Sequence, residues 1–392
     1  MEYIYLGIVF LLFFAANYLF QRIHIPSLLA YIFLGIALSS LLTDNMDSVV
    51  SQIADIGIML LFFLLGLQYS LNHLLSISRR IWQVGTIDII FNFGVSFLIA
   101  YLFFGFNLFA ALIVAGVAYA TSSSITLKML EDTGRNNTPE AEFKVGLLIF
   151  EDIVAPVMVS FLVGFSLAGT ISGGEMAIIA VRVLLLILVS IFIAVYGFRK
   201  LELFVNRFIS EEFMLLFALA VAFLLAGAAI YLELSMLLGV FLAGVIFSET
   251  LASKELVSLI RPIKNATLPF FFFWFGTSVP IEAGIIAPGF LVILIIWGLA
   301  AKALVGFFGG RIYSLTWQGS LRAAFSLGQR GEFSVVIAAL ADPVLRVFCG
   351  IYIIVTALVG VLIFHRAPDY SEKLYLILKK IFPRLFDNGV SS

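Results

Sequence analysis

The chain has 392 residues, of which 62% are hydrophobic and only 12% are charged, and its formal net charge is −1. Because a soluble globular protein carries about twice that share of charged residues, the composition predicts a polytopic membrane protein with nearly all of its length in the bilayer. The near-neutral charge excludes the electrostatic footprint of a nucleic-acid-binding protein, and the single cysteine, Cys349, excludes an intramolecular disulfide or a cysteine-based metal cluster.

Apolar runs of spanning length follow one another along the whole chain. A membrane-spanning helix needs about 20 mostly apolar residues. We read thirteen such runs, so we expect an all-α polytopic membrane protein with about 13 transmembrane helices. The N-terminus lacks the basic region of a signal peptide, which indicates that the first run is a retained span. The runs cover residues 3–20, 27–42, 52–71, 81–104, 106–131, 139–165, 177–197, 211–232, 235–248, 265–280, 290–313, 317–342 and 346–365.

Lysine and arginine residues concentrate in alternate connections between these runs. One set of connections, together with the C-terminal tail, holds nearly all of them, whereas the other set holds Arg346 and almost nothing else. Because cytoplasmic loops carry the excess of lysine and arginine, the pattern predicts an outside N-terminus and a cytoplasmic C-terminus. The transmembrane domain would cover residues 1–366, and a short cytoplasmic tail would cover 367–392.

The two halves of the chain repeat with an offset of 209 residues. Leu28-Leu29 then corresponds to Leu237-Leu238, and Gly35 to Gly244. Residues 3–165 and 211–365 would form two six-helix repeats, joined by a linker helix at 177–197. An odd helix between the halves inverts the second repeat in the membrane. Inverted repeats are typical of secondary transporters, which bind their substrate near the midplane where the repeats meet.

Two spans that correspond under this offset carry polar interruptions. Hydroxyl groups can replace lost backbone hydrogen bonds, and glycines ease local unwinding, so both spans are predicted to be discontinuous helices that cross each other. Broken helices present carbonyls to a cation, and the charged residues would compensate the dipoles of the half-helices. The other interpretation of the serine run is ordinary helix–helix packing. The interruptions comprise Thr121, Ser122, Ser123 and Ser124 in one span, and Gly328, Gln329, Arg330, Gly331 and Glu332 in the other.

Two adjacent carboxylates, Glu151 and Asp152, lie near the middle of run 139–165. A charge at the bilayer centre costs about 2.5–3.5 kcal/mol on insertion scales, so the pair predicts a proton or cation site. The alternative is a pair that only forms hydrogen bonds inside a helix bundle. The serine and threonine hydroxyls of the first interruption would supply neutral ligands to the bound ion.

A lysine, Lys302, lies near the centre of run 290–313. We expect it to pair with Asp152 until a cation displaces it, unless its side chain extends to an interface instead. Asp55 and Asp88 lie near span ends and are expected to face water, while Asn92 would cap the facing interruption.

Several of these segments resemble the bacterial monovalent cation:proton antiporter-2 family. Residues 146–153 carry the resemblance with the sequence Gly-Leu-Leu-Ile-Phe-Glu-Asp-Ile, as do Ser-Ser-Ser at 122–124 and Arg-Gly-Glu-Phe-Ser at 330–334. Residues 62–70 and 239–248 add to it. Within the family the chain looks most like the Kef-type potassium–proton antiporters, and especially the stand-alone Kht-type transport subunit.

The resemblance implies a homodimer in the bacterial inner membrane, with a Na⁺/H⁺ antiporter-like fold and crossing discontinuous helices. It assigns Asp152 as the carrier of proton and cation, Glu151 as its neighbour and Lys302 as the midplane lysine. Glu151 stands where many glutathione-gated members have Gln, so the resemblance does not decide which cation is transported. About 25 residues follow the last run. Because a tail of this length is too short for a regulatory domain, we expect regulation by a separate, nucleotide-responsive cytoplasmic subunit, as in the Kht-type relatives that the chain resembles.

The function predicted from the sequence is exchange of a monovalent cation, potassium first, for protons. A sodium/proton antiporter of the same fold is the main alternative, and a cation channel is a remote one. We expect no enzyme activity and no cofactor. An intramembrane protease would need two facing catalytic aspartates or a Ser–His pair, and the three histidines all lie at the edges of apolar runs.

Overall fold

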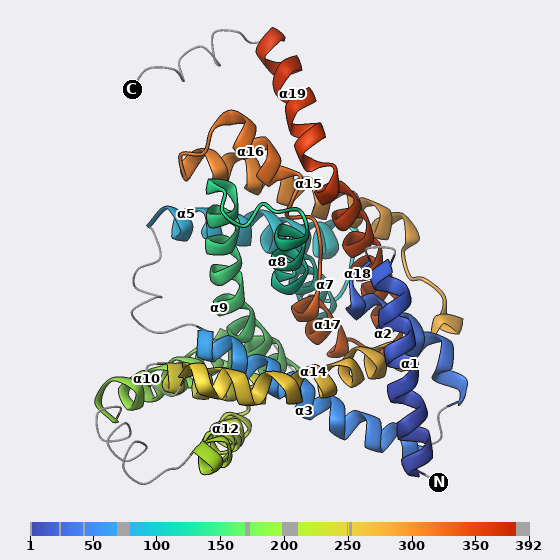
Figure 1. Ribbon diagram of the computed structural model, residues 1–392, viewed down its shortest axis with the longest axis vertical. Helices are drawn as coiled ribbons and strands as arrows, with labels where there is room; N and C mark the ends of the chain where they lie inside the picture. Colours follow the sequence, from blue (N-terminus) through green and yellow to red (C-terminus); the bar gives the residue numbers. More distant parts are fainter. Residues whose placement is uncertain are drawn as a thin grey trace. The chain divides into compact units, whose positions relative to one another are not determined.

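The computed structural model describes residues 2–22, 25–41, 44–68, 79–168, 173–197, 211–248, 250 and 253–381, and every regular element among them is a helix (Figure 1). The chain forms two compact units. Unit 1 comprises residues 1–76 and 154–278, and unit 2 comprises 77–153 and 279–392. Helix α9 (Pro139–Ala168) contributes to both units.

Each of the thirteen predicted runs overlaps one helix or consecutive helices, although the helices Asp44–Gln68 and Ser253–Thr277 begin before their runs at 52–71 and 265–280. Among the described residues, eight helices are long and apolar enough to span a membrane, and α2 (Ser27–Leu38), α7 (Leu108–Tyr119) and α13 (Met236–Ser248) are shorter apolar helices. The two short runs at 27–42 and 235–248 therefore remain short as helices. The prediction of an all-helical polytopic membrane protein is confirmed.

Unit 1 contains helices from both halves of the chain together with the predicted linker helix at 177–197. Helix α14 packs on α2 and α3, and α13 packs on α3 and α12. The elements of unit 1, besides the second half of α9, are α1 (Glu2–Arg22), α2 (Ser27–Leu38), η1 (Ser39–Leu41), α3 (Asp44–Gln68), α10 (Gly173–Phe192), η4 (Ile193–Gly197), α12 (Glu211–Tyr231), α13 (Met236–Ser248) and α14 (Ser253–Thr277).

The helix bounds follow the predicted repeat. Adding 209 to the bounds of α1 and α3 gives the bounds of α12 and α14. The packing repeats too. A Cβ on Gly35 of α2 would lie 3.0 Å from the Cα of Gly276 on α14, and one on Gly244 of α13 would lie 2.9 Å from the Cα of Gly66 on α3. Such close backbone approach requires glycine on both helices, as is common between membrane helices.

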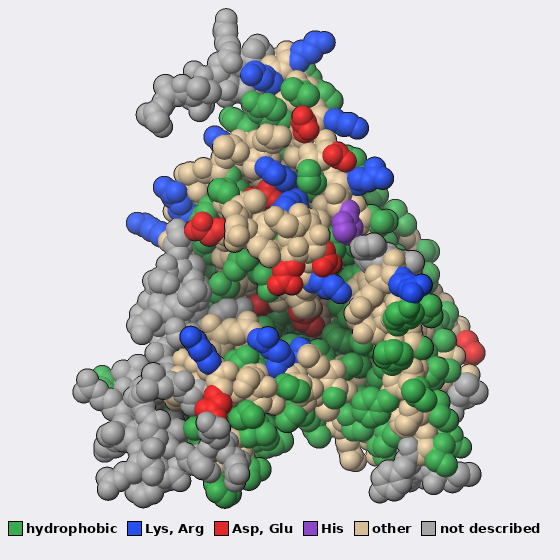
Figure 2. Space-filling view, in the orientation of Figure 1, with side chains coloured by type: hydrophobic (Ala, Val, Ile, Leu, Met, Phe, Trp, Pro, Cys, Tyr) green, Lys and Arg blue, Asp and Glu red, His purple; other side chains and the backbone are tan. Residues whose placement is uncertain are grey.

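Unit 2 holds both interrupted spans. Charged side chains gather over α16 and α19 on the face drawn in Figure 2. Helix α19 lies in the segment expected to be a short tail, and the sequence analysis did not predict it. The elements, besides the first half of α9, are α5 (Arg79–Asp88), η2 (Ile89–Gly94), α6 (Val95–Leu98), η3 (Ile99–Phe103), α7 (Leu108–Tyr119), α8 (Ser123–Asp132), η5 (Ile281–Ala283), α15 (Pro288–Ile312), α16 (Trp317–Ala324), α17 (Glu332–Ala339), α18 (Pro343–His365) and α19 (Ala367–Ile381).

Candidate functional site

The two interrupted spans cross at their breaks. Helices α7 and α8 are separated by residues 120–122, and α16 and α17 by residues 325–331. Thr121 and Arg330 form an isolated antiparallel bridge, and the Ser122 N–H donates to the Gln329 carbonyl at 2.9 Å. Thr121 and Arg330 are the residues that the offset of 209 relates. The prediction of crossing discontinuous helices is therefore confirmed.

Gly331 allows the two breaks to approach this closely. A Cβ built on Gly331 would lie 2.3 Å from both Cβ and Oγ of Ser122. Contacts this short do not occur between real side chains, so a larger residue at 331 would force the two segments apart. The glycine predicted to ease unwinding thus has a second role, because it gives the crossing the space that it needs.

Glu332 is surrounded by the serines that begin α8. The hydroxyl of Ser122 donates to its Oε2 at 2.8 Å, and that of Ser124 lies 3.0 Å from Oε1 and 3.1 Å from Oε2. Ser123 Oγ donates to Oε1 at 3.3 Å. A carboxylate next to the N-terminus of α8 compensates the positive end of that helix dipole. Glu332 therefore compensates a half-helix dipole, as predicted. Its carboxylate accepts hydrogen bonds from the serine hydroxyls that were expected to bind the cation. Their role as cation ligands stays a prediction.

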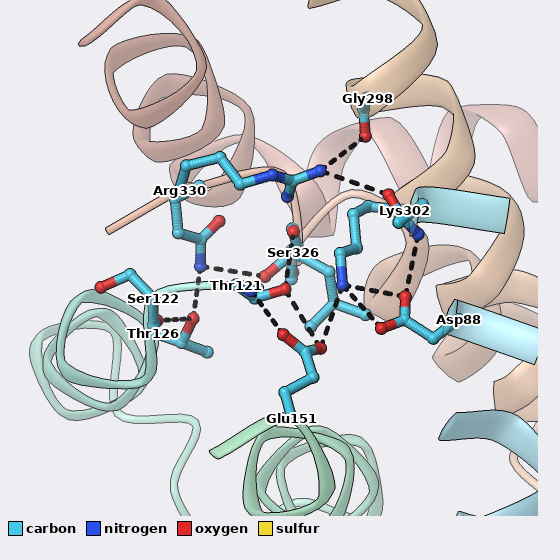
Figure 3. A network of polar contacts seen from close by, with 12 residues as sticks. Asp88, Thr121, Ser122, Thr126, Glu151, Gly298, Lys302, Ser326 and Arg330 are labelled. Carbon is cyan, nitrogen blue, oxygen red and sulfur yellow. Dashed lines mark hydrogen bonds and ion pairs between the residues drawn. The ribbon is translucent and has the colours of Figure 1, made fainter. Parts of the chain in front are cut away.

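Arg330 is fully buried and joins the crossing to the neighbouring helices. Its Nη2 donates to the Gly298 carbonyl on α15 and to Oδ1 of Asn92 on η2, both at 3.2 Å (Figure 3). Asn92 also donates to Asp88 at 2.9 Å. Asn92 therefore contacts a side chain of the facing interruption, and the cap that was expected of it stays a prediction. On the other side of the break, Gln329 donates to the Thr126 hydroxyl of α8 at 2.6 Å.

Lys302 pairs with two carboxylates. Its Nζ lies 2.8 Å from Asp88 Oδ1, 2.9 Å from Asp88 Oδ2 and 3.1 Å from Glu151 Oε1 (Figure 3). All three side chains are fully buried. The lysine therefore does not extend to an interface. The expected pairing with Asp152 stays a prediction.

Asp88 was expected to face water, and this is wrong, because it is buried between Lys302 and Asn92. Asp55, for which the same was expected, is exposed. Sequence position near a span end did not distinguish the two. A signal for Asp88 was available: Asn92 follows four residues later, on the same helix face, so the two polar groups could satisfy each other.

Glu151 links α9 to the crossing. Its carboxylate accepts a hydrogen bond from the Thr121 N–H, and the Thr121 hydroxyl lies 3.3 Å from its Oε1. Asp152 is the next residue on α9 and is 1% exposed. Successive residues point about 100° apart around a helix. Glu151 therefore faces the break and Lys302, and Asp152 faces another side of α9.

The buried charged groups around the crossing carry excess negative charge when fully ionised. Four carboxylates, Asp88, Glu151, Asp152 and Glu332, stand against Lys302 and Arg330, which gives a formal charge of −2, and each side chain is at most 4% exposed. Such a charge in a low-dielectric interior favours uptake of a proton or a cation. The arrangement thus supports binding of positively charged ions.

Comparisons with known proteins agree with this geometry. A family model described as "Sodium/hydrogen exchanger, transmembrane" matches residues 8–366. The chain is 39% identical over 369 residues to the ammonium/H⁺ antiporter subunit AmhT of Alkalihalophilus pseudofirmus, covering 94% of each chain. It is 30% identical over 348 residues to the K⁺/H⁺ antiporter subunit KhtU of Bacillus subtilis, covering 86% of this chain and 83% of the relative.

The fold also matches a solved structure. The sodium proton antiporter MjNhaP1 from Methanocaldococcus jannaschii superimposes with a TM-score of 0.73 at 16% identity, covering 95% of this chain and 99% of that chain. At this identity the similarity shows the fold alone.

Proposed function

The chain belongs to the sodium/hydrogen exchanger family as a monovalent cation/proton antiporter, and from that premise we propose that it exchanges potassium or ammonium for protons. Potassium is the ion predicted from the sequence and the one named for the KhtU relative. Ammonium is named for AmhT. The two ions have the same charge and similar size, so one site can accept both. Sodium is the competing substrate.

The observation that carries this proposal is the different environment of the two adjacent carboxylates. Glu151 is held by Lys302 and by the Thr121 N–H, whereas Asp152 faces another side of the same helix. We assign Asp152 as the group that binds either a proton or a cation. Glu151, Lys302 and Asp88 form a buried group of formal charge −1 beside it, which favours a positive ion.

Competition for one carboxylate couples the two ions. A bare carboxylate costs several kcal/mol in the apolar part of a membrane, so Asp152 crosses the barrier only when it holds a proton or a cation. Outward movement of one ion then requires return with the other, which is obligatory exchange. A channel would lack this requirement and would conduct the cation without an imposed proton gradient.

The assembly and orientation are parts of the same proposal. Both AmhT and KhtU are named antiporter subunits, which supports a separate partner subunit, and we propose that it is cytoplasmic, nucleotide-responsive and regulatory. We further propose a homodimer in the bacterial inner membrane. The distribution of lysine and arginine supports an outside N-terminus and a cytoplasmic C-terminus.

Exchange in proteoliposomes tests the function. Vesicles with an imposed pH gradient and an internal pH dye receive potassium, ammonium, sodium or rubidium in turn. Potassium and ammonium are expected to dissipate the gradient, and sodium is expected to do so weakly. Because ammonia crosses bilayers unaided, the ammonium signal is read against vesicles that contain Asp152→Asn. Exchange with sodium alone would replace the proposed substrate, and no proton movement with any cation would overturn the proposal.

A further inference from the structure

A second buried charge cluster lies in unit 2, at the start of α9. Its centre is Glu140, which is 2% exposed. Glu140 Oε1 lies 3.4 Å from Lys144 Nζ and 3.5 Å from Arg135 Nη1, and Oε2 lies 2.7 Å from Arg322 Nε. One carboxylate therefore serves three cations. We refer to these four residues as the Glu140 cluster.

The cluster depends on Glu140 because its cations are largely withdrawn from water. The side chain of Lys144 is fully buried, that of Arg135 is 8% exposed and that of Arg322 is 30% exposed. The ring of Phe364 on α18 adds a weaker partner, with Arg135 Cζ at 4.3 Å and Lys144 Nζ at 4.8 Å from its centroid. Of the described residues, Glu140 is the one whose carboxylate pairs with all three cations.

Two of the three cations come from the interrupted spans that form the crossing. Arg135 follows α8 by three residues, Arg322 lies on α16, and Lys144 lies one turn after Glu140 on α9. Helix α8 follows the first break, and α16 precedes the second. Glu140 precedes Glu151 by eleven residues on α9, which is roughly 16 Å along a helix axis. The cluster thus holds the end of α8 that is far from its break, and the last turn of α16 just before its break, on the helix that carries Glu151 and Asp152.

Helix α8 is consequently attached to α9 at both of its ends. At the crossing, the Thr121 N–H donates to Glu151. At the other end, Arg135 pairs with Glu140. Helix α16 is attached at Arg322, and the break that follows it supplies the Gln329 carbonyl to Ser122. Loss of the Glu140 attachments would remove the ion pairs that join the end of α8 and the last turn of α16 to α9.

We infer that Glu140 is a positioning residue for cation binding, which holds α8 and α16 on α9 and so keeps the crossing aligned with Glu151 and Asp152. The inference rests on the proposed cation/proton exchange. Misalignment of a binding site lowers its affinity for the ion. Loss of the attachment is therefore expected to raise the KM for the transported cation more than it lowers the maximal rate.

The test measures KM and maximal rate of exchange in proteoliposomes, with the cation that drives wild-type exchange best. Glu140→Gln is expected to raise KM by roughly three- to tenfold, which lies in the lower part of the range of coupling between contacting residues. Glu140→Asp keeps the charge and should restore part of the affinity. Glu142→Gln is the matched control, because Glu142 lies on the same helix turn and instead accepts a hydrogen bond from Tyr313 at an exposed site.

Arg322→Gln distinguishes positioning from simple repulsion of the cation. If the excess positive charge of the cluster repelled the incoming ion, removal of Arg322 would lower KM. If Glu140 acts by attachment, the same substitution releases α16 and raises KM. Because Arg322 is partly exposed, its substitution is expected to leave the protein folded. If Glu140→Gln does not fold, Arg322→Gln and Glu140→Asp still measure the effect of the attachment on KM.

The outcomes separate this inference from the proposed function. An inactive wild type would overturn the proposed exchange. An active wild type, with KM unchanged in folded Glu140→Gln or lowered in Arg322→Gln, would overturn the positioning role and leave the exchange intact. A raised KM in both variants, with Glu142→Gln at the wild-type value, supports the inference.

Discussion

Lys302 and Asp88 form a buried ion pair in which Nζ lies 2.8 Å from Oδ1 and 2.9 Å from Oδ2. Glu151 is the second carboxylate of Lys302, at 3.1 Å. Asp88 lies at the end of α5, so the lysine charge is balanced from a helix other than α9. A proton or cation that arrives at α9 therefore does not leave Lys302 without a counter-ion.

Lys302→Met is expected to destabilise the protein. The substitution leaves Asp88 and Glu151 without their cation, and removal of one member of a buried pair costs about 3–5 kcal/mol. Thermal unfolding in detergent should show a clear fall in Tm. The control is Lys128→Met, which removes an exposed lysine of α8.

The double variant Lys302→Met with Asp88→Asn tests the pairing directly. It removes both charges and should regain part of the lost stability. Thermal losses that simply add would mean that the two residues are energetically independent, contrary to the contact seen here.

Asp152→Asn is expected to abolish exchange while the protein remains folded. Asparagine has the shape of aspartate but cannot carry a proton or the negative charge that binds the cation. Dye-monitored exchange should fall to the level of protein-free vesicles, with size-exclusion profile and Tm close to wild type. Asp132→Asn, at an exposed position on α8, should transport normally. Wild-type turnover of the Asp152 variant would exclude it as the carrier.

Glu151→Gln should retain measurable exchange with an altered pH dependence. Gln can still accept the hydrogen bond from the Thr121 N–H, and Lys302 keeps its contacts with Asp88. Loss of the neighbouring negative charge changes how readily Asp152 exchanges its proton. The pH profile of exchange measures this change. Complete inactivity of a well-folded variant would show that Glu151 is itself an obligatory carrier.

Glu151→Leu is the complementary variant. It removes the acceptor of the buried Thr121 N–H, and an unpaired buried donor costs about 1–3 kcal/mol. We expect it to lose more thermal stability than Glu151→Gln. Equal Tm values for the two variants would argue against the Thr121–Glu151 hydrogen bond as a support of the crossing.

Gly331→Ala should disrupt the crossing, because its Cβ would lie 2.3 Å from the Ser122 side chain. Overpacking of this kind costs about 1–3 kcal/mol, and we expect a lowered Tm together with a large loss of exchange. Gly289→Ala is the control, since a Cβ there meets nothing within 4 Å. Adding Ser122→Gly should recover part of the stability, and failure to do so would locate the strain elsewhere.

The sequence alone determined the helices and their repetition. A span depends on the length of an apolar run, which is a property of neighbouring residues, so the predicted runs overlap helices. The offset of 209 likewise predicted that the Thr121 and Arg330 segments correspond, and these two residues form the bridge at the crossing. The importance of Glu151 and Asp152 also followed from sequence, because two charges in an apolar run need a compensating environment.

Only the tertiary structure decided which charges meet. Whether Asp88 faces water or Lys302 depends on the rotation of α5 and on the helix packed against it, and neither is encoded in the position of Asp88 along its run. The hydrogen bonds that Glu332 accepts from the serine hydroxyls also depend on tertiary packing, since they join residues about 210 positions apart. No role was predicted for Glu140 or Arg322 from the sequence, and with Arg135 they form a largely buried cluster because three separate segments converge there.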